Sequence, residues 1–137
     1  MKRTILLALV LACGAAQASN WVRISAKDAP AQEYVDLSSV QVDGSRRIAW
    51  LKFVFRPHSY KGNSTKFYAN DIELADIQCD TKQTRELSIT VQYEDGSSEH
   101  SATAREWEPI PPDTAIEVAM LYLCKPMPNP SKAAAQK

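Results

Sequence analysis

The fold is decided by residues 112–124, which read Pro112-Asp113-Thr114-Ala115-Ile116-Glu117-Val118-Ala119-Met120-Leu121-Tyr122-Leu123-Cys124. This is the only segment after residue 20 whose pattern predicts an α-helix. Thr114 and Glu117 have the spacing of a capping box, in which each side chain accepts a hydrogen bond from a backbone N–H of the first turn. Ile116, Met120 and Leu123 recur at three- and four-residue steps and form one apolar stripe. The helix is therefore expected to bury that stripe against the rest of the domain.

The segments before this helix carry β-strand patterns separated by turns. Asp43-Gly44 and Asp95-Gly96 are hairpin signals, because glycine accepts the positive φ that two-residue turns require. Apolar, aromatic and β-branched runs predict strands at residues 21–25, 33–35, 47–56, 72–79 and 87–93. Residues 99–103 are expected to return from the second turn as a polar edge strand. Closely spaced strands of this kind form antiparallel meanders. The sequence thus predicts an α+β fold, in which an antiparallel sheet of about six strands packs on one C-terminal helix.

The run from Arg47 to Arg56 is apolar at both parities, which predicts a strand in the middle of the sheet. One face is expected to lie under the helix and the other under loops or a second subunit. Phe53 and Phe55 are expected to point outward and to form a dimer interface on the sheet surface. Residues 57–70 predict a long exposed loop, and a bulge is expected near Ala75-Asp76 because the apolar parity changes there.

The first 18 residues have the features of a secretory signal peptide. Lys2 and Arg3 give the basic start, residues 4–12 the apolar middle and Ala16-Gln17-Ala18 the small-residue cleavage motif. Cleavage between Ala18 and Ser19 would release a soluble domain to the periplasm or the cell surface. The alternative is a lipoprotein signal. Residues 10–13 resemble a lipobox, and in that case Cys13 would carry lipid and bind the protein to a membrane.

Removal of the signal peptide leaves two cysteines, Cys79 and Cys124, in an oxidising compartment. They are too far apart for a C-x-x-C redox motif, and two thiolates without a histidine at ligand spacing make a poor zinc site. A structural disulfide between them is expected. On the chain-entropy model of loop closure it would stabilise the fold by ~4 kcal/mol.

The chain of 137 residues suits one folded domain. We expect a signal peptide at residues 1–18, the domain at residues 19–125 and a disordered tail at residues 126–137, which has little to bury. The whole chain has 16 basic and 16 acidic residues, so loss of Lys2 and Arg3 leaves two more acidic than basic residues. Nucleic-acid binding, which favours a clustered positive surface, is not expected.

Residues that could carry chemistry are scattered along the chain. His58 and His100 are expected to be solvated. Asp71, Glu73 and Asp76 are close in sequence, and a solvated strand edge explains them better than a calcium site. No serine-hydrolase motif or phosphate-binding glycine loop is present. The sequence therefore predicts no enzyme activity, no metal and no cofactor. Three tryptophans are expected to pack in the core or its rim, with an interface anchor as the alternative: Trp21, Trp50 and Trp107.

Several motifs spread across the chain resemble one known family. They are Trp21-Val22-Arg23-Ile24, Tyr34-Val35-Asp36-Leu37-Ser38-Ser39-Val40, Ala49-Trp50-Leu51, Ile77-Gln78-Cys79-Asp80, residues 85–93 with the Asp95-Gly96 turn, Trp107-Glu108-Pro109-Ile110-Pro111-Pro112-Asp113-Thr114, and Leu123-Cys124. Through them, residues 21–125 resemble the surface-adhesin protein E family of Gram-negative bacteria. The resemblance implies an antiparallel sheet on a C-terminal helix, a disulfide between Cys79 and Cys124, and a tendency to dimerise. It also implies an adhesin that engages host matrix and plasma proteins, since the family's named member is an outer-membrane lipoprotein adhesin.

Three classes of function follow from these observations. The leading hypothesis is a non-enzymatic, protein-binding adhesin-like module of the cell envelope, whose ligand is a host matrix or envelope protein. The first alternative is a periplasmic structural or envelope-stress protein with no host ligand. The second is a small-molecule binding domain, which a deep apolar pocket with convergent polar groups would favour.

Overall fold

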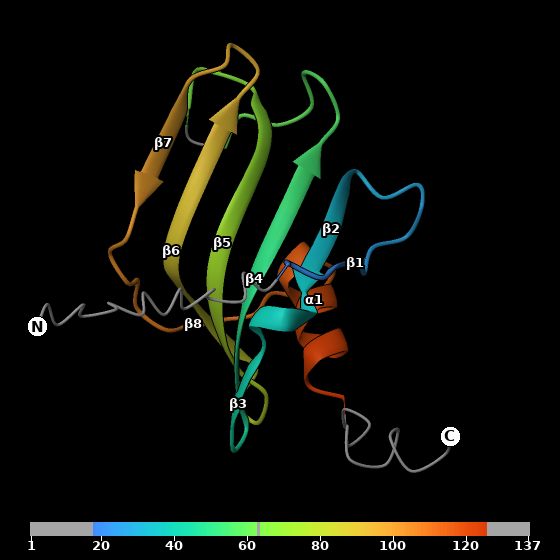
Figure 1. Ribbon diagram of the computed structural model, residues 1–137, viewed down its shortest axis with the longest axis vertical. Coiled ribbons are helices and arrows are strands. Elements are labelled where there is room, and N and C mark those ends of the chain that lie inside the picture. Colours follow the sequence, from blue (N-terminus) through green and yellow to red (C-terminus); the bar gives the residue numbers. More distant parts are fainter. Residues whose placement is uncertain (1–17, 63, 126–137) are drawn as a thin grey trace, which may run out of the picture.

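The computed structural model describes residues 18–62 and 64–125. In this part of the chain, eight antiparallel strands form one twisted sheet, and helix α1 (Ala115–Leu123) lies behind it (Figure 1). The sheet order is β1-β2-β4-β5-β6-β7, with β3 paired to β4 and β8 paired to β6. The strands are β1 (Trp21–Arg23), β2 (Ala31–Asp36), β3 (Gln41–Asp43), β4 (Arg46–Phe55), β5 (Tyr68–Gln78), β6 (Gln83–Tyr93), β7 (Ser98–Ser101) and β8 (Glu108–Pro109).

The predicted α+β meander is confirmed. Strands β4, β5, β6 and β7 follow one another both in the chain and in the sheet, as short turns require. The turns at Gly44 and Gly96 have positive φ angles of 55° and 83°, which glycine adopts without the steric penalty of a side chain. A 3₁₀ turn at Leu37–Ser39 ends β2, where the Asp36 side chain accepts a hydrogen bond from the backbone N–H of Ser38.

Strand β4 has the central position that its sequence predicts, but the face that meets the helix is the opposite of the one predicted. Ala49, Leu51 and Phe53 point to the helix side and join the core cluster with Ala119, Met120 and Leu123 of α1. Phe53 is only 8% exposed and Phe55 packs against the same cluster. The prediction that these phenylalanines face outward is therefore wrong. The outward residues are those of the other parity, such as Trp50.

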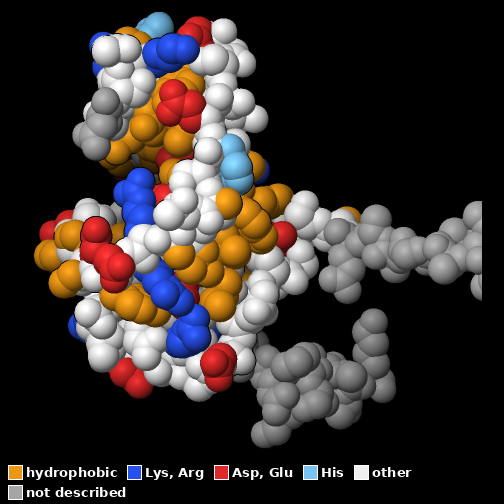
Figure 2. Space-filling model, turned by 90° about the vertical axis from the view of Figure 1, so that its left-hand side faces the viewer, with side chains coloured by type: hydrophobic (Ala, Val, Ile, Leu, Met, Phe, Trp, Pro, Cys, Tyr) orange, Lys and Arg blue, Asp and Glu red, His pale blue; other side chains and the backbone are white. Residues whose placement is uncertain are grey.

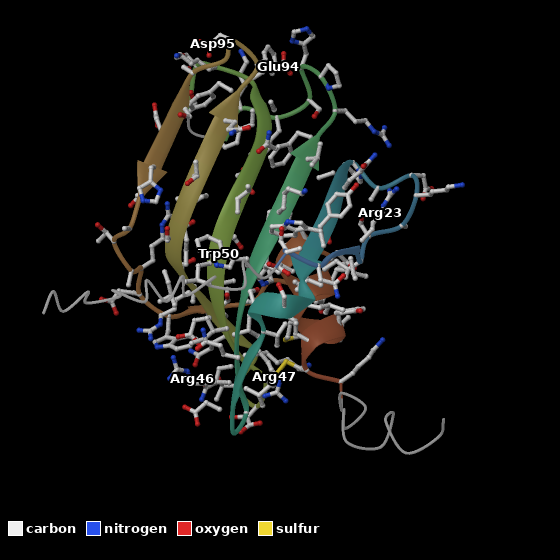
Figure 3. All side chains as sticks on the ribbon, in the orientation of Figure 1. Arg23, Arg46, Arg47, Trp50, Glu94 and Asp95 are labelled. Atoms are coloured by element: carbon white, nitrogen blue, oxygen red, sulfur yellow. A yellow bond between two sulfur atoms is a disulfide. The ribbon has the colours of Figure 1, made fainter. Side chains whose placement is uncertain are left out.

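Helix α1 is tied to the sheet at its C-terminal end. Cys124, the C-cap residue, forms a disulfide with Cys79, just after β5, with a Cα–Cα distance of 5.7 Å. Arg47 Nε of β4 donates to the Leu123 carbonyl at 3.2 Å, which places a cation at the negative end of the helix. Figure 3 shows the yellow sulfur atoms beside Arg47. In the described residues, no helix is both long and apolar enough to cross a membrane.

The N-terminal end of α1 differs from the predicted capping box. Thr114 is the N-cap residue, but its hydroxyl donates to the Pro111 carbonyl at 2.7 Å instead of capping the first turn. Glu117 Oε2 accepts from the backbone N–H of Asp113 at 2.7 Å, one residue earlier than a capping box requires. Asp113 has a positive φ of 58°, which shifts the backbone N–H groups relative to the side chains. The capping-box prediction is therefore wrong in its hydrogen bonds, although Thr114 is the N-cap residue.

Three predicted features fall outside the described residues: the signal peptide except for Ala18, the lipobox with Cys13, and the tail at 126–137. Ala18 and Ser19 stand exposed at the start of the described part.

Candidate functional site

Helix α1 covers only part of its side of the sheet, and the uncovered part is a groove. Two adjoining cavities of about 450 and 420 Å³ share Ala31, Thr114 and Ala115. A third cavity of about 190 Å³ continues from them past Glu73 and Ile116. We call this series of cavities the inner groove. Its floor is formed by strands β2, β4, β5 and β6, and one wall is the first turn of α1.

The sheet register brings acidic side chains from separate strands into the inner groove. Glu33 on β2 pairs with Phe53 on β4, and Phe53 pairs with Asp71 on β5. Paired residues share a face, so the two acids flank Phe53 on the helix side. With neighbouring strands ~4.8 Å apart, their backbones are about 10 Å from each other. Glu73 lies two residues further along β5, on the same face, and pairs with Leu51.

A bulge adds a fourth acid to this set. Leu74 pairs with Ser88, but the next residue, Ala75, pairs with Glu86, so Leu87 is an extra residue in β6. The predicted irregularity near Ala75-Asp76 is thus present between strands β5 and β6, but the extra residue is in β6. The bulge turns Glu86 toward the helix side, close to Glu73.

The carboxyl groups in the groove are shielded from water, and their pKa values rise. Burial, and then the charge of Glu86, raises the pKa of Asp71 to about 7. Burial, and then the charges of Asp71 and Glu86, raises the pKa of Glu73 to about 8 against the opposing charge of Arg105. Burial also raises the pKa of Glu33. Asp71 and Glu73 therefore exchange protons near neutral pH, where ordinary carboxyl groups are fully ionised.

Two carboxylate oxygens in the groove are buried without a hydrogen-bond partner among the described residues. They are Oε2 of Glu33 and Oδ1 of Asp71. The two residues are only 7% and 8% exposed. The prediction that Asp71 lies at a solvated strand edge is wrong, because the helix and the aromatic side chains of the groove exclude water from it.

Aromatic rings lie at the middle cavity of the inner groove, which Phe55 and Tyr60 line. Phe55 stacks on Tyr60 with ring centroids 4.8 Å apart, and Tyr68 meets both Tyr60 and Tyr93 edge-on at 5.2 and 5.3 Å. Tyr68 reaches this face because Ala69 is an extra residue in the pairing of β5 with β6. At Gly62, the backbone has a φ of 53° and a Cβ atom would lie 2.9 Å from the Tyr68 hydroxyl, so a larger residue would be strained and would displace the ring.

Asp76, predicted to be solvated, is fully buried on the opposite, outer face of the sheet. Its carboxylate accepts from Arg46 Nη2 at 2.6 Å and from Arg85 Nε at 2.9 Å. Burial alone would raise its pKa, but the hydrogen bonds and charges of the two arginines outweigh burial and lower the pKa. The Trp107 ring lies 4.6 Å from the Arg85 guanidinium and covers this triad. The triad is a structural ion pair network, since no unpaired oxygen is left in it for a ligand.

The outer face of the sheet carries half-buried apolar and basic side chains. Lys52 Nζ lies over the rings of Trp21 and Tyr34 at 4.7 and 4.9 Å. Trp50, labelled near the middle of the sheet in Figure 3, projects from the neighbouring position of β4. Seen from the β7 side, hydrophobic side chains form a broad area that a row of Lys and Arg side chains crosses (Figure 2). The predicted rim packing of the tryptophans agrees with this arrangement.

Both histidines lie on the surface, as predicted, although each has a partner. His58 Nδ1 is 2.9 Å from Glu94 Oε2, and His100 Nδ1 is 2.9 Å from the Thr90 hydroxyl. Figure 3 places Glu94 at the turn that follows β6. Across residues 18–62 and 64–125, no group of three His, Cys, Asp or Glu side chains is close enough to hold a metal ion.

The family assignment rests on a match over the whole described domain. A sequence model of the family described as surface-adhesin protein E matches residues 21–125. The chain belongs to this family. It is therefore a surface-adhesin-like protein, and its family is one of adhesins and not of enzymes.

Among the solved structures that match the chain are two of protein E of Haemophilus influenzae. One is 16% identical, covers 78% of this chain and 85% of that chain, and has a TM-score of 0.49. The other, from a non-typeable strain, is 15% identical, covers 83% and 81%, and has a TM-score of 0.46. No curated protein matches the chain.

Proposed function

We propose that this protein is an exported, non-enzymatic module of the bacterial cell envelope. It is exposed on the cell surface, where it binds another protein. The observation that carries the proposal is the family match over residues 21–125, which spans every described strand and the helix. The Cys79–Cys124 disulfide supports export, because such bonds persist in oxidising compartments. On this proposal, residues 1–18 are a signal peptide cleaved between Ala18 and Ser19, residues 19–125 are the binding domain and residues 126–137 are a tail.

We also propose that two copies associate through the outer face of the sheet. Trp50, Ile72 and Leu74 lie on this face in adjacent positions of β4 and β5 and stay half-exposed in the single chain. A second copy would cover them, and Lys52, which lies on the same face beside Ile72, would stand at the contact.

Protease treatment of intact cells tests the surface location. The loops offer exposed trypsin sites at Lys27, Lys61 and Lys66. Trypsin added to intact cells should remove the folded protein from an immunoblot while a periplasmic marker protein stays whole, and lysed cells should lose the protein in the same way. If intact cells protect it and lysed cells do not, the protein is periplasmic and the envelope-structure alternative replaces the adhesin proposal.

A further inference from the structure

The inner groove contains polar groups that the fold does not need and does not satisfy. Oε2 of Glu33 and Oδ1 of Asp71 are buried, yet each is without a hydrogen-bond partner in the described part of the chain. A buried carboxylate that lacks partners is costly, and buried polar groups in native proteins are paired almost without exception. By contrast, the buried carboxylate of Asp76 on the outer face is fully paired with two arginines. Glu33 and Asp71, which we call the groove acids, therefore point to a ligand that supplies the missing donors.

The missing donors must be cationic. A carboxylate only accepts hydrogen bonds, and ammonium or guanidinium groups are the donors that also neutralise its charge. Apart from Arg85 and Arg105, the charged residues that line the three cavities are acidic. Both arginines are already engaged, Arg85 with Asp76 and Arg105 with Glu86. Glu117 and Asp113 add further acidic groups from the start of α1.

The groove acids do not form a cage for a metal ion. Glu33 and Asp71 are on either side of Phe53, about 10 Å apart by the spacing of strands. Within the described residues, no cluster of three metal-ligating side chains is found here or elsewhere. The middle cavity of the groove suits an organic cation, because aromatic rings such as Phe55 and Tyr60 attract ammonium and guanidinium groups.

The shape of the groove distinguishes a polypeptide from a small amine. Its three cavities lie in series, from Pro30 and Glu33 at one end to Glu106 and Glu108 at the other. A small amine would reach one of the unpaired carboxylates and leave the other buried and unpaired. An extended segment with successive basic side chains can reach both.

We propose that the inner groove binds a basic segment of the partner protein, with one arginine or lysine side chain at Asp71 and another at Glu33. This inference rests on the proposed function, since it names the contact through which the module holds its protein ligand. Binding requires the groove acids to be ionised, so it strengthens as they lose their protons.

The test uses the mature protein, residues 19–137, and hexa-arginine as the probe, in isothermal titration at about 150 mM salt, where non-specific attraction between distant charges is screened. At pH 8.5 the wild type should bind hexa-arginine, and the isosteric double variant Glu33→Gln/Asp71→Asn should bind at least tenfold more weakly. The matched control Asp80→Asn, which removes an exposed acid outside the groove, should bind like the wild type. At pH 5.5, binding to the wild type should fall toward that of the double variant.

Several results would overturn the inference. They are no binding to the wild type, equal weakening by Asp80→Asn, or equal binding at pH 5.5 and pH 8.5. Agmatine that binds as tightly as hexa-arginine would also overturn it, because the site would then be one for a free amine. These outcomes are independent of the protease test on cells. A protein that is exposed on cells but does not bind hexa-arginine keeps its proposed function and loses this groove assignment.

Discussion

Replacing Asp71 with asparagine should stabilise the protein in alkaline solution and leave its stability unchanged in acid. Asp71 is 8% exposed, and burial followed by the charge of Glu86 raises its pKa from 3.8 to about 7. In the unfolded chain the group keeps the lower value. Between about pH 4 and pH 7 the folded protein therefore holds a proton that the unfolded chain has lost, and stability falls as the pH rises through this window.

The size of the effect follows from the two pKa values. Each tenfold change in proton affinity is worth about 1.4 kcal/mol, so a rise from 3.8 to about 7 corresponds to about 4 kcal/mol of destabilisation once the folded state has ionised. This value is an upper limit, because local relaxation and entering water solvate part of the charge. Asparagine keeps the shape of the side chain and has no charge to bury. Its gain should be near zero at pH 4 and close to the limit at pH 8.5, a shift in melting temperature on the order of 10 °C.

Urea unfolding followed by circular dichroism at pH 4, 6 and 8.5 measures the free energy of unfolding of the wild type and of Asp71→Asn directly. The wild type should lose stability from pH 4 to pH 8.5, and Asp71→Asn should lose much less of it. Asp80→Asn serves as the control, since it removes an exposed carboxyl group and should follow the wild type at every pH. A variant that is destabilised by the same amount at all three pH values would refute the reasoning, because the Asp71 carboxyl would then be a paired structural group.

Three further predictions address the disulfide, self-association and export. Cys124→Ser should lower the melting temperature by ten degrees or more, since the disulfide is worth ~4 kcal/mol; two titratable thiols in the untreated wild type would show that the bond does not form. Trp50→Glu should weaken self-association in sedimentation and keep the fold, whereas Phe53→Glu should unfold the core. A wild type that stays monomeric at tens of micromolar would contradict the dimer proposal. The intact mass of the exported protein should correspond to a chain that begins at Ser19, and a lipidated species that begins at Cys13 would refute cleavage after Ala18.

The sequence predicted the fold well because the decisive signals are local. The stripe of Ile116, Met120 and Leu123 and the Asp-Gly turns at 43–44 and 95–96 depend on neighbours in the chain, so they predict the helix and the meander without tertiary information. The faces of β4 could not be predicted, because a strand that is apolar at both parities contains no signal for which side meets the helix. The structure decides this through the register with β2 and β5.

The inner groove was missed for a related reason. Asp71 and Glu73 alternate with Ile72 and Leu74, a pattern that normally places the acids in water and the apolar residues inside. Here the strand has the acids on the helix side, and Ile72 and Leu74 on the outer face. Glu33 joins them only through a neighbouring strand, and Glu86 and Tyr68 only through extra residues in the pairing of β5 with β6. One signal was available in the sequence. Asp71 and Glu73 are separated from Ile77 by even numbers of positions, so in a regular strand they lie on the same face as this core residue.

The central claim is that the inner groove, and not the outer face, holds the basic segment of a protein ligand. Nuclear magnetic resonance of the isotope-labelled mature protein, titrated with hexa-arginine at pH 8.5, tests it most directly. We expect the largest shifts on Glu33, Phe53 and Asp71, and the signals of Trp50 and Ile72 on the outer face should stay in place. Shifts confined to the outer face, or spread evenly over the exposed acids, would contradict the claim.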